Sequence, residues 1–436
     1  MTKSILSHPT RCVLALVLNV GFLCATLCGQ TETERAQEPG ADSNETAADA
    51  VDQAAAIEVG KRHFIDSKIL GQQREYWVHL PASYQPSPYL PQRYPVLFLL
   101  DGDVQFHAVS GIVSFMGESG WQIPEMIVVG IPHQNRTKEL TPTQTINDFR
   151  PGKTSELQRD SGGGDDFLAF VTQELIPQID SDYRTRPFRV LFGHSYGGLL
   201  GAHAFLRNQS SFQAFILADP SLWWDDRVLV KRLQRAIDSN AFDARREAVF
   251  LSHVLPYRAP GDDVLQSGFE NVEASIRAFE AELKRADGVR FRSQKFPGET
   301  HHSVPIQTLY RGLLHVFEGY QFPQEYFLGQ PEKIERHFHS VSKLLDLQVL
   351  PPEPMIDLWG DAFLGYDEDF QRYAIPLLQL NAANYPSSPN AHTSLGKAQM
   401  TLDDLAAARV SFEMALALDA ENEEAKASLK ELSRKQ

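Results

Sequence analysis

Short apolar runs separated by segments of helical spacing constrain the fold of this chain most strongly. Runs of this length without a polar alternation are typical of strands buried on both faces of a sheet. They lie at residues 96–100, 126–129, 189–192, 215–217 and 248–251, with a last candidate at 289–296. Helical spacing between them, and a half-buried strand pair at 57–81, predict an α/β fold with a mostly parallel sheet.

One turn between a strand and a helix carries a nucleophile motif. The pattern Gly-x-Ser-x-Gly spans Gly193, Ser195 and Gly197, after an apolar run that ends at Phe192 and before a helical run that starts near Leu199. In this context the pattern predicts a nucleophile elbow, in which strained backbone exposes the serine hydroxyl. The fold expected is therefore the three-layer α/β-hydrolase sandwich over residues 57–320.

A serine hydroxyl needs a base to remove its proton, and the base is expected after the last strand. His301 and His302 both follow the 289–296 run. In α/β-hydrolases the chain order is serine, acid, histidine, and Ser195 and His301 fit that order.

The acid that would orient the histidine has several candidates. Asp262 and Asp263 lie in the loop after the 248–251 run, where a carboxylate is expected. Glu270 and Glu273 follow on an expected helix, and Asp219 follows the preceding strand. Asp262 and Asp263 are the prediction, and a serine–histidine dyad without an acid remains an alternative.

The remaining parts of an acyl-transfer site are also predicted. The backbone amides of Tyr196 and of Gly102 or Asp103 would form the oxyanion hole. Trp223 and Trp224 either line the substrate pocket with Tyr196 or pack in the core. Neither a metal nor a cofactor is expected, because the chain carries no metal-ligand spacing and no phosphate-loop motif.

The amino terminus predicts export. Residues 1–28 combine a basic flank with an apolar run, which is typical of a secretory signal, and a periplasmic or secreted protein is expected. A lipid anchor at Cys28 and an uncleaved anchor are the alternatives. All three cysteines lie in this segment, so no thiol nucleophile is expected after cleavage. Residues 29–56 have the composition of a disordered linker, and the net charge of −15 argues against nucleic acid as a partner.

The carboxyl-terminal part of the chain differs from the α/β domain. Residues 321–365, which contain several prolines, are predicted to be an irregular connector. Residues 366–436 fit a tetratricopeptide-like frame of 34 residues, with a generic helical hairpin as the alternative. Because so few repeats seldom fold alone, this module is expected to lean on the α/β domain or to hold a protein partner.

Several segments together resemble the enterochelin-esterase and esterase D group of α/β-hydrolases. They are LLDGD at 99–103, VGI at 129–131, NRTKELTP at 135–142, GGGDDF at 162–167, YRT at 183–185, the elbow, PSLWWD at 220–225 and GETHHSV at 298–304. The resemblance implies that His301, in a His-x-Ser-Val pattern, is the base. The chain departs from the group at Asp219, where the group has serine, and in the 255–263 loop, which lacks the usual Gly-x-x-Glu.

The resemblance implies acyl chemistry on a small ester, because the group hydrolyses substrates from siderophore lactones to feruloyl esters. We therefore expect a serine ester hydrolase that forms an acyl-enzyme on Ser195. An acyltransferase of the same fold is one alternative. A catalytically silent hydrolase domain that serves as a protein-binding scaffold is the other.

Overall fold

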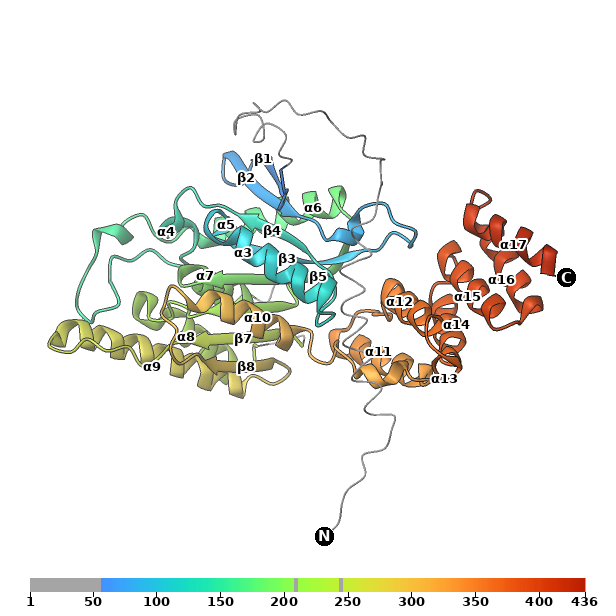
Figure 1. The fold of residues 1–436 in the computed structure, drawn as a ribbon. Helices are drawn as coiled ribbons and strands as arrows, with labels where there is room; N and C mark the ends of the chain where they lie inside the picture. The colour runs from blue at the N-terminus through green and yellow to red at the C-terminus, as the bar shows by residue number, and fades with distance from the viewer. Residues whose placement is uncertain (1–55, 208–210, 243–245, 436) are drawn as a thin grey trace, which may run out of the picture.

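The computed structural model describes residues 56–207, 211–242 and 246–435. They form an α/β domain with a helical region beside it (Figure 1). The predicted export signal and the expected linker up to residue 55 lie outside the described residues. In the described part of the chain, no helix is long and apolar enough to cross a membrane.

An eight-stranded sheet in the order β1-β2-β4-β3-β5-β6-β7-β8 forms the centre of the α/β domain. β1 and β2 pair antiparallel, β2 joins β4 antiparallel, and the strands from β4 to β8 are parallel. The predicted α/β-hydrolase fold is confirmed, and each predicted apolar run overlaps one of β3 to β8. The strands are β1 (Lys61–Ser67), β2 (Gln72–His79), β3 (Tyr94–Leu100), β4 (Ile127–Ile131), β5 (Thr185–His194), β6 (Ala214–Ala218), β7 (Ala248–His253) and β8 (Arg290–Lys295).

Helices cover both faces of the sheet, which explains why its central strands are apolar throughout (Figure 1). In β3, Leu97 and Leu99 pack with α3 and α10, whereas Val96 and Phe98 pack with the helices of the opposite face. The first layer comprises α3 (Gly102–Ser114), continued by η2 (Phe115–Ser119), and α10 (Val304–Val316). The second comprises α5 (Gly164–Phe170), η4 (Val171–Leu175), α6 (Ile176–Asp182), α7 (Tyr196–Leu206), α8 (Trp224–Asp238) and α9 (Asp263–Arg285). The short elements are η1 (Ala82–Tyr84), α4 (Arg136–Glu139) and η3 (Glu156–Gln158).

The segment predicted as an irregular connector, residues 321–365, is largely helical, so that prediction is wrong. It contains η5 (Gln324–Phe327), α11 (Pro331–Leu345) and α12 (Glu353–Leu364). Two of the prolines that suggested irregular backbone stand in the first turn of a helix, Pro331 in α11 and Pro354 in α12, and Pro323 and Pro352 are N-caps. Proline is favoured there because the first amides of a helix have no partner within it.

The last helices pack as successive antiparallel pairs. Two of these contacts are equivalent: a Cβ at Gly360 of α12 would lie 2.6 Å from Leu378 of α14, and one at Gly396 of α15 would lie 2.7 Å from Phe412 of α16. The first helix of the first pair is therefore α12, which the sequence interpretation left in the connector. The helices are α13 (Glu368–Gln371), α14 (Ala374–Asn384), α15 (Pro389–Thr401), α16 (Leu405–Leu418) and α17 (Glu423–Lys435).

The helical region shares a hydrophobic core with the α/β domain. One cluster of buried residues runs from Leu97 of β3 through Val316 of α10 to Trp359 of α12 and Leu377 of α14. Of the predicted helical module, residues 366–436, α14 contributes Ala374, Leu377 and Leu380 to this cluster. Polar contacts join the same parts, since the Tyr89 hydroxyl donates to Asp357 Oδ2 at 3.1 Å.

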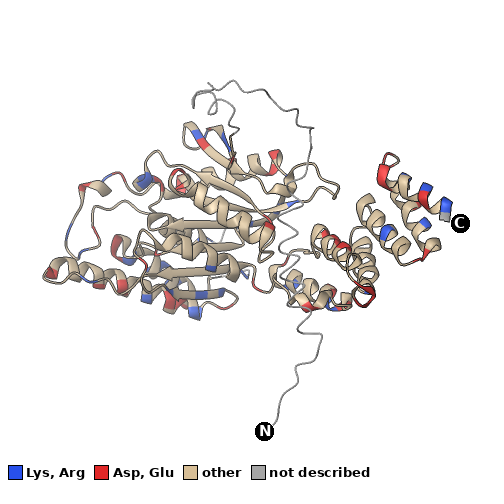
Figure 2. Ribbon diagram, in the orientation of Figure 1, with Lys and Arg blue, Asp and Glu red and all other residues tan. Residues whose placement is uncertain are grey.

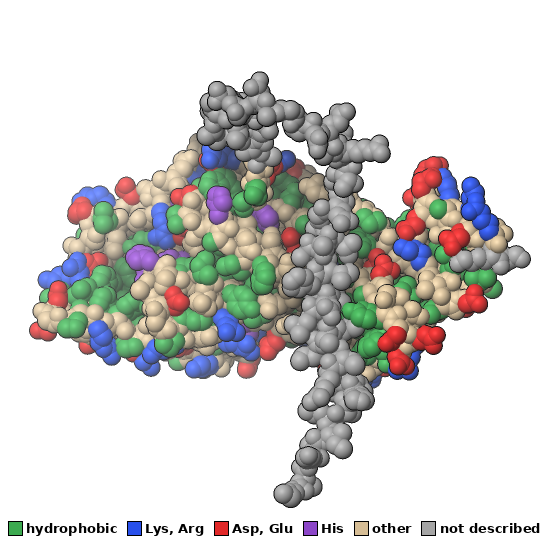
Figure 3. Space-filling model, in the orientation of Figure 1, with side chains coloured by type: hydrophobic (Ala, Val, Ile, Leu, Met, Phe, Trp, Pro, Cys, Tyr) green, Lys and Arg blue, Asp and Glu red, His purple; other side chains and the backbone are tan. Residues whose placement is uncertain are grey.

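The surface mixes charges and apolar groups. Acidic and basic residues alternate along the exposed helices of both parts (Figure 2). Apolar side chains gather over α3 and α10 on the face shown in Figure 3. Large apolar side chains exposed on or next to these elements are those of Val104, Phe115 and Ile306.

Candidate active site

The predicted nucleophile elbow is present as a sharp turn from β5 into α7. Ser195 has φ 58° and ψ −112°, a conformation that a residue with a side chain adopts only under strain. Glycine is required sterically at position 193, because a Cβ there would lie 2.3 Å from the carbonyl oxygen of Gly197. The turn places Ser195 at the carboxyl edge of the parallel strands, beyond the end of β5.

The structure places His301 beside the elbow and pairs it with a carboxylate. The rings of His301 and His194 have centroids 4.5 Å apart, and His194 directly precedes Ser195. Nδ1 of His301 lies 2.7 Å from Oδ2 of Asp219, whose side chain is 1% exposed. An Nδ1–H that donates to this carboxylate leaves the Nε2 lone pair to accept a proton, which is the tautomer that a general base requires.

Asp262 and Asp263, the predicted acids, lie elsewhere, and the structure corrects that placement. Asp262 is the N-cap of α9, where its Oδ1 accepts from the amide of Leu265 at 2.8 Å, and Asp263 is the exposed first residue of that helix. Both suit a helix N-terminus, which favours negative charge. Of the other candidates, Glu270 accepts from Gln266 and Glu273 pairs with Arg277 on the same helix. Asp219 is thus the carboxylate that contacts His301.

Two further residues belong to the site: Tyr257, which lies in none of the sequence motifs, and Ser221, which lies in the PSLWWD segment but was given no role. The Tyr257 hydroxyl, in the loop after β7, donates to Asp219 Oδ2 and lies 3.4 Å from His301 Nδ1. Burial, together with the charge of Asp219, raises the pKa of Tyr257, so it remains a neutral donor. The Ser221 hydroxyl lies 3.3 Å from Ser195 Oγ. Both lie in loops whose approach to the elbow depends on the tertiary fold.

The amides expected to form an oxyanion hole lie at two helix N-termini. Tyr196 is the first residue of α7 and Gly102 the first residue of α3, so neither N–H has a partner within its helix. The two helices follow the adjacent parallel strands β5 and β3. A Cβ at Gly102 would lie 2.6 Å from the amide nitrogen of Ile131, so only glycine fits at this position. Helix N-termini favour an anion, as an oxyanion hole must.

Half-buried aromatic rings extend from Ser195 along one side of the site. The Trp223 ring packs against Tyr196, with centroids 6.4 Å apart, and against Phe149 at 6.0 Å. Phe269 continues the series between Phe149 and Tyr257. Trp224, predicted as a possible pocket residue, is fully buried and donates to the carbonyl of Thr143. Of the two predicted tryptophans, only Trp223 is therefore exposed enough to meet a substrate.

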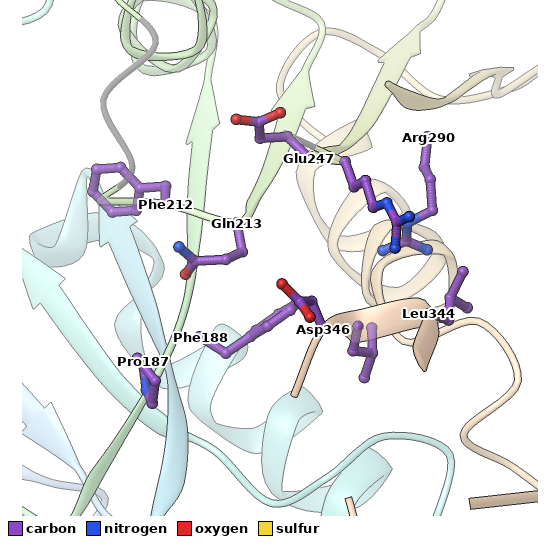
Figure 4. Close-up of a pocket in the computed structure, with 10 residues that line it drawn as sticks. Pro187, Phe188, Phe212, Gln213, Glu247, Arg290, Leu344 and Asp346 are labelled. Atoms are coloured by element: carbon purple, nitrogen blue, oxygen red, sulfur yellow. The ribbon is translucent and has the colours of Figure 1, made fainter. Parts of the chain in front are cut away.

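Two cavities lie near the other edge of the sheet, where the strands begin. One of about 230 Å³ has Phe212 and Gln213 on one side and Arg290 and Leu344 on the other (Figure 4). A second, of about 660 Å³, lies at the seam with the helical region, and Tyr94 at the start of β3 lines it. At about 3.3 Å per residue along β5, Phe188 of the first cavity lies about 23 Å from Ser195, and Thr185, which pairs with Tyr94 of the second cavity, lies about 33 Å from it. Neither cavity contributes to the site around Ser195.

Comparison with known proteins agrees with this geometry. Residues 67–266 match the model of the Esterase family, described as "Putative esterase". Over these residues the α/β domain is similar to the Esterase family. Ferri-bacillibactin esterase BesA of Bacillus subtilis is 30% identical over 174 residues, which are 37% of this chain and 58% of that protein. The siderophore triacetylfusarinine C esterase of Aspergillus fumigatus is 23% identical over 53% of this chain and 84% of that protein.

A solved structure extends the similarity beyond the α/β domain. An IroE-like serine hydrolase from Shewanella oneidensis is 27% identical, with a TM-score of 0.64. The match covers 74% of this chain and 99% of that protein. The described residues contain no group of three or more histidine, cysteine or acidic side chains that could hold a metal ion.

Proposed function

We propose that this protein is a member of the Esterase family and a serine-dependent carboxylic ester hydrolase. The observation that carries the proposal is the contact between His301 Nδ1 and the buried Asp219 carboxylate beside the strained elbow of Ser195. A histidine held in this tautomer next to a serine elbow is the arrangement that activates a serine hydroxyl.

The proposed reaction proceeds through an acyl-enzyme. Ser195 Oγ attacks the ester carbonyl carbon while His301 Nε2 takes the hydroxyl proton, and the amides of Tyr196 and Gly102 stabilise the oxyanion. The alcohol leaves with the proton from His301 as the ester C–O bond breaks. Water then attacks the acyl-enzyme, His301 takes a proton from it, and the carboxylic acid is released as Ser195 regains its hydrogen.

Asp219 takes the role for which Asp262 and Asp263 were predicted. The group that the sequence resembles has serine at this position, and its acid is expected in the loop after β7. In this chain that loop supplies Tyr257, whose hydroxyl donates to Asp219. We propose that the acid has moved from the loop after β7 to the end of β6, and that Tyr257 holds it there.

The proposed substrate is an ester that carries a planar aromatic or bulky apolar group. The aromatic series through Trp223 and Phe149 offers half-buried ring faces next to Ser195, and such faces stack on flat apolar groups. BesA is named a ferri-bacillibactin esterase and the Aspergillus relative a siderophore triacetylfusarinine C esterase. An iron-chelating ester of this kind is the class we propose for this protein.

Hydrolysis of chromogenic esters tests the proposal. The full chain should hydrolyse an aryl ester, and Ser195→Ala should lower kcat to background. Ser340→Ala, on the exposed side of α11, is the matched control and should retain full activity. Equal activity of Ser195→Ala and the parent chain would refute the serine mechanism. Analysis of products in the presence of added alcohol distinguishes hydrolysis from acyl transfer, since transfer yields a new ester.

Two further proposals concern the rest of the chain. From the basic and apolar pattern of residues 1–28, we propose that the protein is exported. We also propose that the last helices present a surface for a protein partner, because they lie beside the α/β domain, away from α7, which follows Ser195 (Figure 1). Amino-terminal sequencing of the protein from the cell exterior or periplasm tests the first, since cleavage should remove all three cysteines.

A further inference from the structure

The cavity at the seam between the α/β domain and the helical region has the size of a small-molecule site. It encloses about 660 Å³, and such sites enclose about 300–1,000 Å³. Segments far apart in the sequence form its wall: the loops before β3 and β4, the end of α10 and the chain that joins α11 to α12. Apolar side chains dominate this wall, among them Trp121, Phe317, Leu347 and Met355. Sites for small molecules are mostly apolar and favour boundaries between structural units, so the cavity has the general form of one.

A buried hydroxyl in the wall has no hydrogen-bond partner among the described residues. Tyr320, just after α10, is 6% exposed and lines the cavity, but its Oη makes no hydrogen bond to any residue that the structure describes. Burial, with smaller effects of the neighbouring Tyr385 and Glu125, raises the pKa of Tyr320, so the hydroxyl stays neutral. A hydroxyl buried to this extent usually has a partner, and a ligand in the cavity would supply one.

Two carboxylates in the same wall have no basic partner in the described part of the chain. Oε2 of Glu125 accepts from the Ser83 hydroxyl at 2.6 Å, and Oε1 of Glu118 accepts from the Ala82 amide at 3.0 Å. Neither glutamate forms an ion pair with a described residue. Burial raises the pKa of Glu125 against the hydrogen bond from Ser83, and the charge of Glu118 raises it further. Two carboxylates that disfavour each other's charge in this way favour a cation beside them.

Two arginines that also line the cavity are held by backbone carbonyls. Nε of Arg186 donates to the carbonyl of Arg93 at 3.0 Å, and its Nη1 donates to the carbonyl of Gln348. Nη1 of Arg93 donates to the carbonyl of Thr185 at 3.4 Å. These contacts use guanidinium donors to join the start of β5 to its neighbours, whereas the two glutamates accept only from uncharged groups. An anion that binds the arginines is the competing ligand, and the experiment must separate it from a cation.

We propose that the seam cavity is a second binding site, for a small organic amine with an apolar or aromatic body. The ammonium group would donate to Glu125 and Glu118 and to the Oη of Tyr320. The body would pack on the apolar wall, whose aromatic rings also attract a cation. The cavity lies at the edge of the sheet opposite Ser195, so this ligand is not the ester substrate and the inference does not rest on the proposed function.

Binding of 2-phenylethylamine to the full chain tests the proposal. The uncharged and anionic analogues are 2-phenylethanol and 3-phenylpropionate, which have nearly the same shape. Titration calorimetry at pH 7.5 should show saturable binding of the amine, with a Kd about 10-fold or more below that of the alcohol. The reason is that a hydrogen bond to a charged group contributes more than one between neutral groups. The amine should also raise Tm, because it binds only the folded chain.

Variants of the wall locate the bound amine. Glu125→Gln should raise the Kd of the amine about 10-fold and leave that of the alcohol within about twofold, because it removes the charge and keeps the shape. Tyr320→Phe removes one hydrogen bond and should raise the Kd of the amine about 2- to 10-fold. Leu347→Trp fills the cavity and should abolish binding of all three probes. Glu335→Gln, on the exposed side of α11, is the matched control and should leave every Kd unchanged.

Tighter binding of 3-phenylpropionate than of the amine, or no saturable binding of the amine at millimolar concentrations, would overturn the inference. Trp223→Ala distinguishes the seam from the aromatic rings beside Ser195 and should bind the amine as the parent does. Loss of binding in that variant would place the amine at Ser195 and would also overturn the inference. Melting curves check that each variant folds. If Glu125→Gln does not, Glu118→Gln and Tyr320→Phe provide the same readout.

Discussion

Nδ1 of His301 lies 2.7 Å from Oδ2 of Asp219, which directly follows β6. Asp219 has φ 41°, and its amide continues the sheet by donating to the carbonyl of Ser252 at 3.0 Å. The residue thus turns sharply out of the strand while its backbone stays tied to β7. This turn directs the carboxylate toward the loop after β8 that carries His301.

Replacement of Asp219 tests the position of the acid directly. Asp219→Asn should lower kcat on the order of 10³- to 10⁴-fold, because an amide in place of the carboxylate favours the wrong imidazole tautomer and cannot stabilise the imidazolium ion. Steady-state hydrolysis of a chromogenic ester measures the loss.

Asp262→Ala is the contrasting variant for the same assay. It removes the N-cap of α9 and should cost about 1 kcal/mol of unfolding free energy while leaving kcat unchanged. The assignment fails if Asp262→Ala loses activity to the extent expected for Asp219→Asn.

Tyr257 gives a second, smaller prediction. Tyr257→Phe keeps the ring that stacks on Phe269, at a centroid distance of 5.1 Å, and removes only the hydroxyl that donates to Asp219. A hydrogen bond to a charged group contributes about 1.5–3 kcal/mol, so kcat should fall on the order of 10-fold. Tyr385→Phe, which removes a hydroxyl that donates to Pro351 in the helical region, should leave kcat unaltered. Equal kcat values for Tyr257→Phe and the parent would show that Asp219 needs no such support.

The fold and the nucleophile could be predicted because their signals are local. A few consecutive residues identify the buried strand β3, and a few others identify the Gly193–Gly197 elbow. The apolar run before the elbow and the helical run after it distinguish the elbow from a chance match to the motif. The partner of His301 could not be predicted in this way. Which carboxylate reaches it depends on how the loops after β6, β7 and β8 cross, and only the aspartate at position 219, where related sequences have serine, hinted at the answer.

The boundary of the helical region was misplaced for a different reason. Prolines usually interrupt helices, but Pro331 and Pro354 start them, and a residue-by-residue interpretation cannot tell a break from a first turn. The position of the boundary matters for stability, because α12 and α14 belong to the main hydrophobic core rather than to a separable module.

Truncation tests this shared core. A chain that ends at Ser388 loses α15 to α17 but keeps Leu377 and Leu380 of α14 in the main cluster, and Ser388 still donates to the buried Glu353. It should remain soluble and retain full kcat. A chain that ends at residue 365, the boundary predicted from the sequence, loses both leucines, each worth about 1.5–3 kcal/mol of burial, and should unfold or aggregate. Melting curves and soluble yield compare the two, and similar behaviour would contradict the shared core.

His194 should make the stability of the protein depend on pH. Burial, with a smaller contribution from the neighbouring His301, lowers the pKa of His194 to about 4 from its usual 6.5. Between these values the unfolded chain binds a proton that the folded chain does not, so the unfolding free energy is complete above pH 6.5 and decreases as the pH falls toward 4. A shift of this size corresponds to about 3 kcal/mol at most for this residue.

Urea unfolding at pH 4.5 and 7.5 measures this dependence. Burial also lowers the pKa of His203, His253 and His315, so the parent chain will lose stability from several sites at once. His194→Asn isolates one of them, because asparagine does not titrate: the variant is less stable at both pH values, but its loss between them should be smaller by about 2–3 kcal/mol. If parent and variant lose the same free energy between pH 7.5 and 4.5, His194 takes up its proton as readily in the folded protein as in the unfolded chain. The packing of His194 against His301 would then not prevent protonation of His194. The inference that a neutral ring lies beside the proposed base would be wrong.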